Sequence, residues 1–431
     1  APARAWDPAA RVVAAAPGDG AARAALTALA DELGRPRELA TILGEALAAQ
    51  RKAGAPAAEL RAMAIDLAHR VASDAQTQGG AEKAWLTVLE LEPEDDEAFT
   101  ALAALYRSAS RWDDLRALLE RRVAVAAAPA VRMTALVELT TLDEDVLGDP
   151  GRAVNDHRRI LELEPGHLPS YKALERLYAD GESWGELDGV LASELGWAPP
   201  GEHVALRFRR AELHARALDD RAGAVDLLEE VVSAQPSHAD GRELLEELLV
   251  DPSLRQRVAR ILEPLYVRDR LWKDLCGVLR VQREAAVGAD AAHLLGRIAH
   301  VEERELELGR SAFETWAQAL AADPAAPEPQ AAILRLAATY DRWHDAAAAF
   351  DAAATAVGGD LAVALPLRQH VAEICDRSLG DNPRAIAAYQ ALIALDPGDA
   401  ERVTPALVAL ARLHEEEEQW PALRAVLARQ A

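Results

Sequence analysis

The feature that most constrains this chain is a short phrase, Leu-Tyr followed by Trp, that returns in register along the sequence. It reads LYRSASRWDDL from Leu105, LYADGESWGEL from Leu177 and LYVRDRLWKDL from Leu265, with Tyr106, Tyr178 and Tyr266 in the second place. Tryptophan occupies the same place in five copies, Trp112, Trp184, Trp272, Trp343 and Trp420. Apolar residues follow each Trp at the third and seventh positions. These offsets mark one face of an α-helix, so the phrase predicts a turn and then a helix that packs through its Trp face.

Two further markers repeat between these phrases. Prolines end helical patterns at Pro17, Pro93, Pro165, Pro236, Pro324 and Pro397, because a proline ring cannot continue the hydrogen-bond ladder. The stretches LGDPGRAV, LDDRAGAV and LGDNPRAI each place an aspartate before a helical pattern, where it can cap free amide groups. The markers together define a unit of about 72 residues with four helices.

The unit repeats through the chain with one irregularity. We expect units near 1–79, 80–148, 149–219, 220–308, 309–380 and 381–431, the last of them incomplete. The unit at 220–308 contains an added segment, SHADGRELLEELLVDPSLRQRVARILEPLY. This segment predicts an extra helix, with the chain split at Asp251-Pro252.

Composition agrees with a helical chain and restricts its partners. Half of the residues are apolar but only 4% are aromatic, and Ala and Leu dominate, which favours helix over strand. The 71 acidic and 47 basic residues give a formal net charge of −24, which disfavours nucleic acid and anionic membrane surfaces as partners. No apolar run approaches the roughly 20 residues of a membrane span. We therefore expect more than two-thirds helix and no membrane insertion.

The repeat resembles the tetratricopeptide repeat, a helix–turn–helix unit. The residues that carry the resemblance are Leu102, Ala103, Tyr106, Trp112 and Leu119 with Pro93 in one copy, and Leu174, Tyr178, Trp184 and Leu191 with Pro165 in the next. The resemblance implies an all-α superhelix of about a dozen helical hairpins, which we expect to be one continuous solenoid over residues 1–431. It also implies a non-enzymatic scaffold or adaptor that binds a protein or peptide on its concave face. The oligomeric state is left open.

A group of basic residues is the candidate binding site. Lys172 and Arg176 lie four residues apart on a predicted helix, opposite its apolar face. The resemblance places them in the concave groove, where such a pair can hold the terminal carboxylate of a peptide. The next helix of this type adds Arg207 and Arg210. A basic patch on so acidic a chain predicts recruitment of an acidic peptide through charge-assisted hydrogen bonds.

Other functions have less support in the sequence. The stretch GESWG matches the GxSxG motif of serine hydrolases at Ser183, but it lies between two helical patterns and its Trp belongs to the repeat. The histidines and acidic residues lack the spacing of a metal site, so we expect no catalytic residue, metal or cofactor. A ligand-sensing or substrate-recruiting segment of a larger protein is the main alternative, and a hydrolase that uses Ser183 is a remote one. We expect a cytoplasmic location, with export left open because the chain begins at Ala1 rather than Met.

Overall fold

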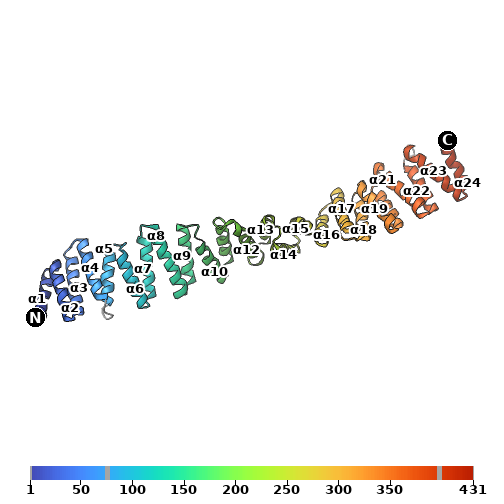
Figure 1. Ribbon diagram of the computed structural model, residues 1–431. Helices are drawn as coiled ribbons and strands as arrows, with labels where there is room; N and C mark the ends of the chain where they lie inside the picture. The colour runs from blue at the N-terminus through green and yellow to red at the C-terminus, as the bar shows by residue number, and fades with distance from the viewer. Residues whose placement is uncertain (1, 73–77, 396–399, 431) are drawn as a thin grey trace. The chain divides into compact units, whose positions relative to one another are not determined.

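The computed structural model describes residues 2–72, 78–395 and 400–430, and in these residues it is all-α (Figure 1). Helices account for 82% of the structure, and the described residues contain no strand. The sequence prediction of more than two-thirds helix is confirmed. Pro397, the last of the helix-ending prolines, lies outside the described residues.

The chain separates into two compact units, Ala1–Leu206 and Arg207–Ala431. The first contains α1 (Pro2–Ala15), α2 (Gly20–Leu33), α3 (Pro36–Lys52), α4 (Ala57–Ala72), α5 (Gln78–Leu91), α6 (Asp96–Ser108), α7 (Trp112–Val125), α8 (Pro129–Thr141), the π-helix η1 (Leu142–Val146), α9 (Pro150–Leu163), α10 (Leu168–Asp180), α11 (Trp184–Glu194) and the 3-10 helix η2 (Pro200–Glu202). Helix α12 (His203–Arg216) crosses the boundary between them. That all of residues 1–431 form one continuous superhelix stays a prediction.

The second unit continues with the same kind of element. It contains α13 (Arg221–Ala234), α14 (Ala239–Leu248), α15 (Arg255–Asp269), α16 (Trp272–Glu284), α17 (Gly288–Arg304), α18 (Gly309–Ala322), α19 (Pro327–Tyr340), α20 (Trp343–Ala356), α21 (Leu361–Glu373), the π-helix η3 (Ile374–Leu379), α22 (Asn382–Leu395), α23 (Ala400–Glu416) and α24 (Trp420–Gln430). Within each unit the main contacts join a helix to the next helix in sequence, and some join alternate helices, such as α18 and α20. This is the tetratricopeptide-like array of stacked helical hairpins that the resemblance predicts.

Helices end near the marker prolines and begin at the capping aspartates, as the sequence predicts. Helices α5, α9, α13 and α18 each end two residues before a marker proline. The Asp149 side chain accepts a hydrogen bond from the Arg152 amide, and Asp220 accepts one from the Gly223 amide, so both cap the helix that follows. The added segment of the unit at 220–308 divides into α14 and α15, on either side of Asp251-Pro252.

The backbone conformation of the turns repeats along the chain, although their residue types change. Two residues before each Trp of the phrase the backbone is left-handed, at Ser110, Glu182, Arg270, Asp341 and Glu418, all with φ near +50°. A second set of left-handed turns precedes the alternate hairpins, at Gly148, Asp219, Glu307 and Gly380. Left-handed backbone costs a residue other than glycine about 1–2 kcal/mol, so the hairpin geometry is imposed on these residues by packing.

The repeated tryptophans are less buried than the sequence suggests. Trp112, Trp184, Trp272 and Trp343 are only partly buried, and Trp420 is 59% exposed. Each is the first residue of its helix, and helical side chains point back toward the N-terminus, so the ring lies over the turn rather than in the core. The tryptophans of the phrase therefore contribute less to the core than its tyrosines do, since Tyr106, Tyr178 and Tyr266 are buried.

A different aromatic position fills the core. Eight residues before the marker proline stand Trp85 and Trp316, which are 2% and 1% exposed. The same position is His157, Leu228 and Tyr389 in other copies, all buried. Among the described residues, no helix is both long and apolar enough to cross a membrane.

Candidate functional site

The basic residues predicted to bind a partner are paired within the protein. Lys172 and Arg176 lie on α10, in the N-terminal unit. The Lys172 Nζ lies 2.9 Å from Glu175 Oε1 and 2.7 Å from Glu194 Oε1. The Arg176 guanidinium donates to the Glu144 carboxylate of η1. A ligand at this pair would compete with carboxylates that the fold already supplies.

Arg207 and Arg210 lie on the part of α12 that belongs to the C-terminal unit. The Arg207 Nε donates to Glu230 Oε2 at 2.7 Å, and Arg210 is not free either. The binding role of all four basic residues stays a prediction.

Arg176 also belongs to a repeated set of ion pairs. Eight residues before the Trp of the phrase stand Arg176, Arg335 and Arg412. They pair with Glu144, Glu303 and Asp376, respectively, and each pair joins the first helix of a Trp hairpin to the hairpin before it. The same contact in three copies indicates that Arg176 has a structural role. The sequence contains a signal for this role, because an arginine occupies the same register in three repeats.

The carboxylates near Lys172 are buried together. Glu194 is fully buried and Glu175 is 5% exposed. Burial, together with the hydrogen bond with Glu175, raises the pKa of Glu194 to about 7, and Lys172 opposes the change. The two acids and one lysine form a charged cluster inside the packing of α10 against α11, where an uncompensated charge is costly.

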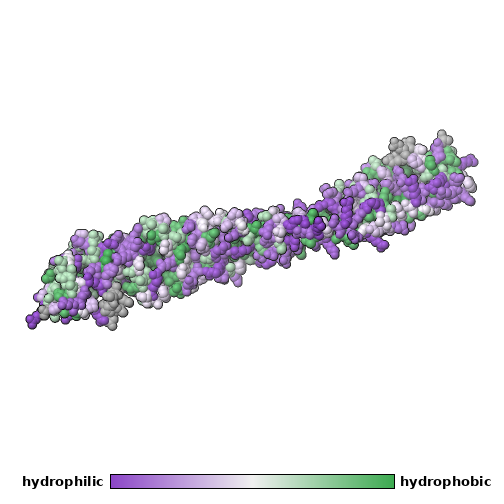
Figure 2. All heavy atoms as spheres, viewed as in Figure 1, coloured by the Kyte–Doolittle hydropathy of each residue, from purple (hydrophilic) through white to green (hydrophobic). Residues whose placement is uncertain are grey.

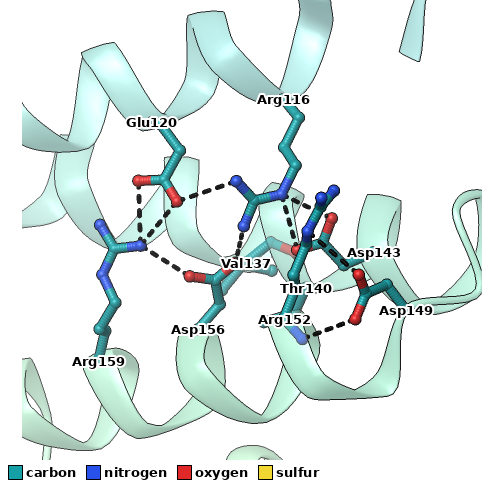
Figure 3. A network of polar contacts seen from close by, with 9 residues as sticks. All are labelled: Arg116, Glu120, Val137, Thr140, Asp143, Asp149, Arg152, Asp156 and Arg159. Atoms are coloured by element: carbon teal, nitrogen blue, oxygen red, sulfur yellow. Dashed lines mark hydrogen bonds and ion pairs between the residues drawn. The ribbon is translucent and has the colours of Figure 1, made fainter. Parts of the chain in front are cut away.

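A second buried network lies one hairpin earlier, between α7, η1 and α9 (Figure 3). The Arg116 Nε donates to both carboxylate oxygens of Asp143, at 3.0 and 3.1 Å, and Asp143 is fully buried. The Arg159 Nη1 donates to Asp156 Oδ1 at 2.7 Å and to Glu120 at 3.1 Å. Burial raises the pKa of Asp156 to about 6, against the effect of Arg159. Three carboxylates thus share two guanidinium groups, and the network links three successive elements.

The hydrolase motif is not in the context it requires. Ser183 lies in the turn between α10 and α11, and its hydroxyl donates to the Gly181 carbonyl at 3.4 Å. A nucleophile elbow needs a strand-to-helix turn, and here both flanking elements are helices. Within the described residues, no group of three His, Cys, Asp or Glu side chains could hold a metal ion.

A histidine–tryptophan–glutamate contact recurs once in each unit. His69 packs edge-on against Trp85 with ring centroids 5.1 Å apart, and His300 packs in the same way on Trp316 at 5.0 Å. The Nε2 of His69 lies 2.8 Å from Glu97, and that of His300 lies 2.8 Å from Glu328. Sequence reasoning missed this set, although both copies keep the same spacing between His, Trp and Glu.

Grooves between neighbouring helices are the sites that could accept a ligand. Three of them lie between consecutive second helices of hairpins: α3 and α5 (about 280 Å³), α9 and α11 (about 480 Å³), and α16 and α18 (about 350 Å³). A fourth lies between α13 and the inserted α15, measures about 730 Å³ and carries three arginines. The residues of α13 that line it correspond in register to those of α9 that line the α9–α11 groove.

Figure 2 shows hydrophilic residues interspersed with smaller hydrophobic groups on the visible face. Apolar and hydrophilic residues are therefore mixed on this side of the repeats.

Comparison with known proteins returned structures of helical repeat proteins. No family model and no curated protein matches the chain. Among solved structures, YrrB, described as a TPR protein with an unusual peptide-binding site, is 16% identical over 42% of this chain and 88% of its own, with a TM-score of 0.24. The Naa15/Naa10 complex bound to HypK-THB is 14% identical over 98% of this chain and 65% of the other, with a TM-score of 0.27.

A tetratricopeptide repeat protein from Parabacteroides merdae is 13% identical over 64% of this chain and 98% of its own, with a TM-score of 0.24. At these values the similarity says nothing about what this chain binds.

Proposed function

We propose that the chain is a non-enzymatic scaffold or adaptor that binds a protein or peptide partner on the surface formed by its repeated hairpins. The observation that carries this proposal is the contact pattern: the helices pack mainly on their neighbours in sequence. Such an array has surface grooves between each hairpin and the next. Repeat proteins use the extended surface that these grooves form to bind extended partners. The first helices, which form the expected concave face, include the helix with Lys172 and Arg176.

The alternative of a ligand-sensing segment requires an enclosed pocket with converging polar groups. The grooves described above are each bounded by one face of two or three helices and open to solvent. The geometry therefore favours an extended partner over an enclosed small molecule.

The proposal is tested by selecting partners with the whole chain. A library of random dodecapeptides displayed on phage is selected against the 431-residue protein, and the enriched peptides are synthesised with a fluorescent label. Fluorescence anisotropy then measures their affinity. We expect specific peptides that bind with a Kd that depends on ionic strength. No enrichment over an unrelated helical protein would reject a peptide-binding function.

The basic residues on the concave face are tested with the same peptides. Arg176→Glu combined with Arg207→Glu leaves Lys172 in place, because removing Lys172 would take away the ammonium group that pairs with the buried Glu175 and Glu194. The control reverses the exposed Arg11 and Lys52 instead. If the peptides bind the first variant and the control with equal affinity, the predicted basic patch has no role in binding.

A further inference from the structure

We infer that the groove between α13 and α15 is a docking site for a short acidic segment of a partner protein with apolar residues between its acids. The inference rests on the proposed function and assigns it a second surface, on the face where the second helices of the hairpins lie side by side. The groove exists because of the segment added within the unit at 220–308, which places α15 beside α13 where the other steps place a second helix.

One face of α15 carries the charge. Arg257, Arg260, Pro264 and Arg268 follow one another at helical spacing and all line the groove. Opposite them, α13 contributes a single charged residue, Glu229. A basic groove on a chain of net charge −24 attracts carboxylates locally while the rest of the surface repels them.

The three arginines differ in how far they are already paired. Arg257 is held by Asp226 and Glu229 of α13, so it joins the two helices. Arg268 pairs with its neighbour Asp269, and that carboxylate is shared with Arg242. These two guanidinium groups are therefore partly neutralised.

Arg260 is the most available of the three. It is exposed, and the only hydrogen bond of its side chain among the described residues is from Nε to the Gln256 carbonyl of its own helix, at 3.2 Å. Both of its terminal amino groups are left to bind a carboxylate in bidentate geometry. Pro264, one turn later, has no amide hydrogen, so the backbone bond to the Arg260 carbonyl is not made. The groove thus offers a pair of donors at one residue, Arg260.

The floor of the groove is apolar. Val232 and Leu265 are buried, Ile261 is partly buried, and Pro236 and Pro264 are exposed beside them. A ligand with charged groups alone would leave this apolar surface exposed to water, whereas a segment with an aliphatic residue between two acidic residues would bury it. Arg260 and Arg268 are about 12 Å apart along the helix axis, a distance that about four residues of extended peptide span.

Charge favours a partner segment over a second copy of this chain. A second copy would bring its own net charge of −24 and be repelled before contact. A short segment brings only two or three carboxylates.

The groove is tested with peptides selected on the full chain and with two matched variants. Arg260→Glu with Arg268→Glu reverses the groove, and Arg304→Glu with Arg310→Glu makes the same charge change at exposed residues elsewhere in the unit. Arg260→Ala serves as a milder variant, since this exposed side chain supports no other element. Far-ultraviolet circular dichroism and thermal melting confirm that each variant folds.

We expect the selection to enrich acidic peptides with interposed apolar residues. Their affinity should fall roughly 30-fold or more for the groove variant and change about twofold or less for the control, because the groove variant loses the charged hydrogen bonds to the carboxylates of the peptide. The same peptides with Asn and Gln in place of Asp and Glu should bind as weakly as the groove variant does.

Each other outcome overturns the inference in a recognisable way. Peptides that bind the wild type and groove variant equally would reject the groove but leave the proposed function standing. Equal losses in the groove variant and the control would indicate non-specific attraction. The absence of any selected peptide would reject both proposals. Self-association that sedimentation detects in the wild type but not in the groove variant would make a second copy the occupant.

Discussion

The two compact units are built from the same hairpins but differ in what they bury beside their apolar side chains. In the C-terminal unit a single apolar cluster runs from Ala211 to Leu413. In the N-terminal unit the corresponding cluster runs from Trp6 to Ile160, and α10 and α11 lie beyond it. In α10 and α11 buried apolar residues such as Leu174 and Leu191 are accompanied by the buried carboxylates of Glu175 and Glu194.

The difference is clearest at one repeat position. The residue eight before the marker proline is Trp85 or Trp316 in two copies, but His157 in the copy that precedes α10. The His157 ring contacts the polar side chains of Glu144 at 2.8 Å and Ser170 at 3.0 Å. Nearby, Asp143, Asp156 and Glu194 are all buried. The C-terminal unit buries Glu302, but Arg280 and Thr315 both donate to that carboxylate.

The largest expected effect tests what the two units share. Trp85→Ala and Trp316→Ala should each lower the free energy of unfolding by about 3–5 kcal/mol, because each removes a fully buried ring. Trp272→Ala should lower it by only about 1–2 kcal/mol, since that ring is partly exposed. Denaturant unfolding of the three variants measures the difference. Equal losses at Trp316 and Trp272 would contradict the burial seen here.

The next effect separates the units. Arg116→Ala should destabilise by about 3 kcal/mol, because it leaves Asp143 and Asp156 buried with fewer cations. Arg280→Ala in the C-terminal unit should destabilise by about 1–2 kcal/mol, since Thr315 still donates to Glu302 and the arginine is half exposed. Unfolding by urea compares the two. A larger loss at Arg280 would reverse the proposed contrast.

Burial of Glu194 should make the stability of α10 and α11, in the N-terminal unit, depend on pH. The pKa of Glu194 rises from 4.5 to about 7 in the folded chain, so the folded state holds its proton over that range while the unfolded state loses it. Stability from this group is therefore present below about pH 4.5 and is lost as the pH rises to about 7. Hydrogen exchange of α10 and α11 should accelerate between pH 5 and pH 8 beyond the intrinsic change.

The matched variant for this prediction is Glu194→Gln, which should remove most of the additional acceleration of hydrogen exchange in α10 and α11. Glu202→Gln, at an exposed carboxylate, serves as its control. An excess that survives in Glu194→Gln would assign the effect to another group.

The smallest effect concerns a turn that both units share. Gly148→Ala should destabilise the protein by about 1 kcal/mol, because left-handed backbone is unfavourable for alanine. The added Cβ would have no neighbour within 4 Å, so a steric clash adds nothing to this value. Glu307→Gly at the same register in the C-terminal unit should be neutral or stabilise by up to about 1 kcal/mol. Melting temperatures of both variants test the sign. Destabilisation by both would indicate that the Glu307 side chain matters more than its backbone.

Much of the local structure follows from sequence alone. The marker prolines end helices, Asp149 and Asp220 cap them, and the insertion splits at Asp251-Pro252, because each of these depends on atoms within a few residues. The all-α class follows from composition and period for the same reason. A repeat in sequence also predicts a repeat in structure. The left-handed turns show this repeat at ten positions, although the residue type changes from one turn to the next: Gly34, Ser110, Gly148, Glu182, Asp219, Arg270, Glu307, Asp341, Gly380 and Glu418.

Contacts between distant residues were decided by the tertiary structure. Sequence reasoning placed Lys172 and Arg176 on one helix face, but it could not show that Glu194 and Glu144, from other elements, pair with them. It singled out the recurring tryptophans, yet burial depends on where a helix starts relative to its neighbours, and the core rings proved to be Trp85 and Trp316. The arginine groove beside α15 arises in the same way, because an inserted helix changes which faces meet. Helix period is a property of the local chain, whereas burial, ion pairing and grooves are properties of two surfaces in contact.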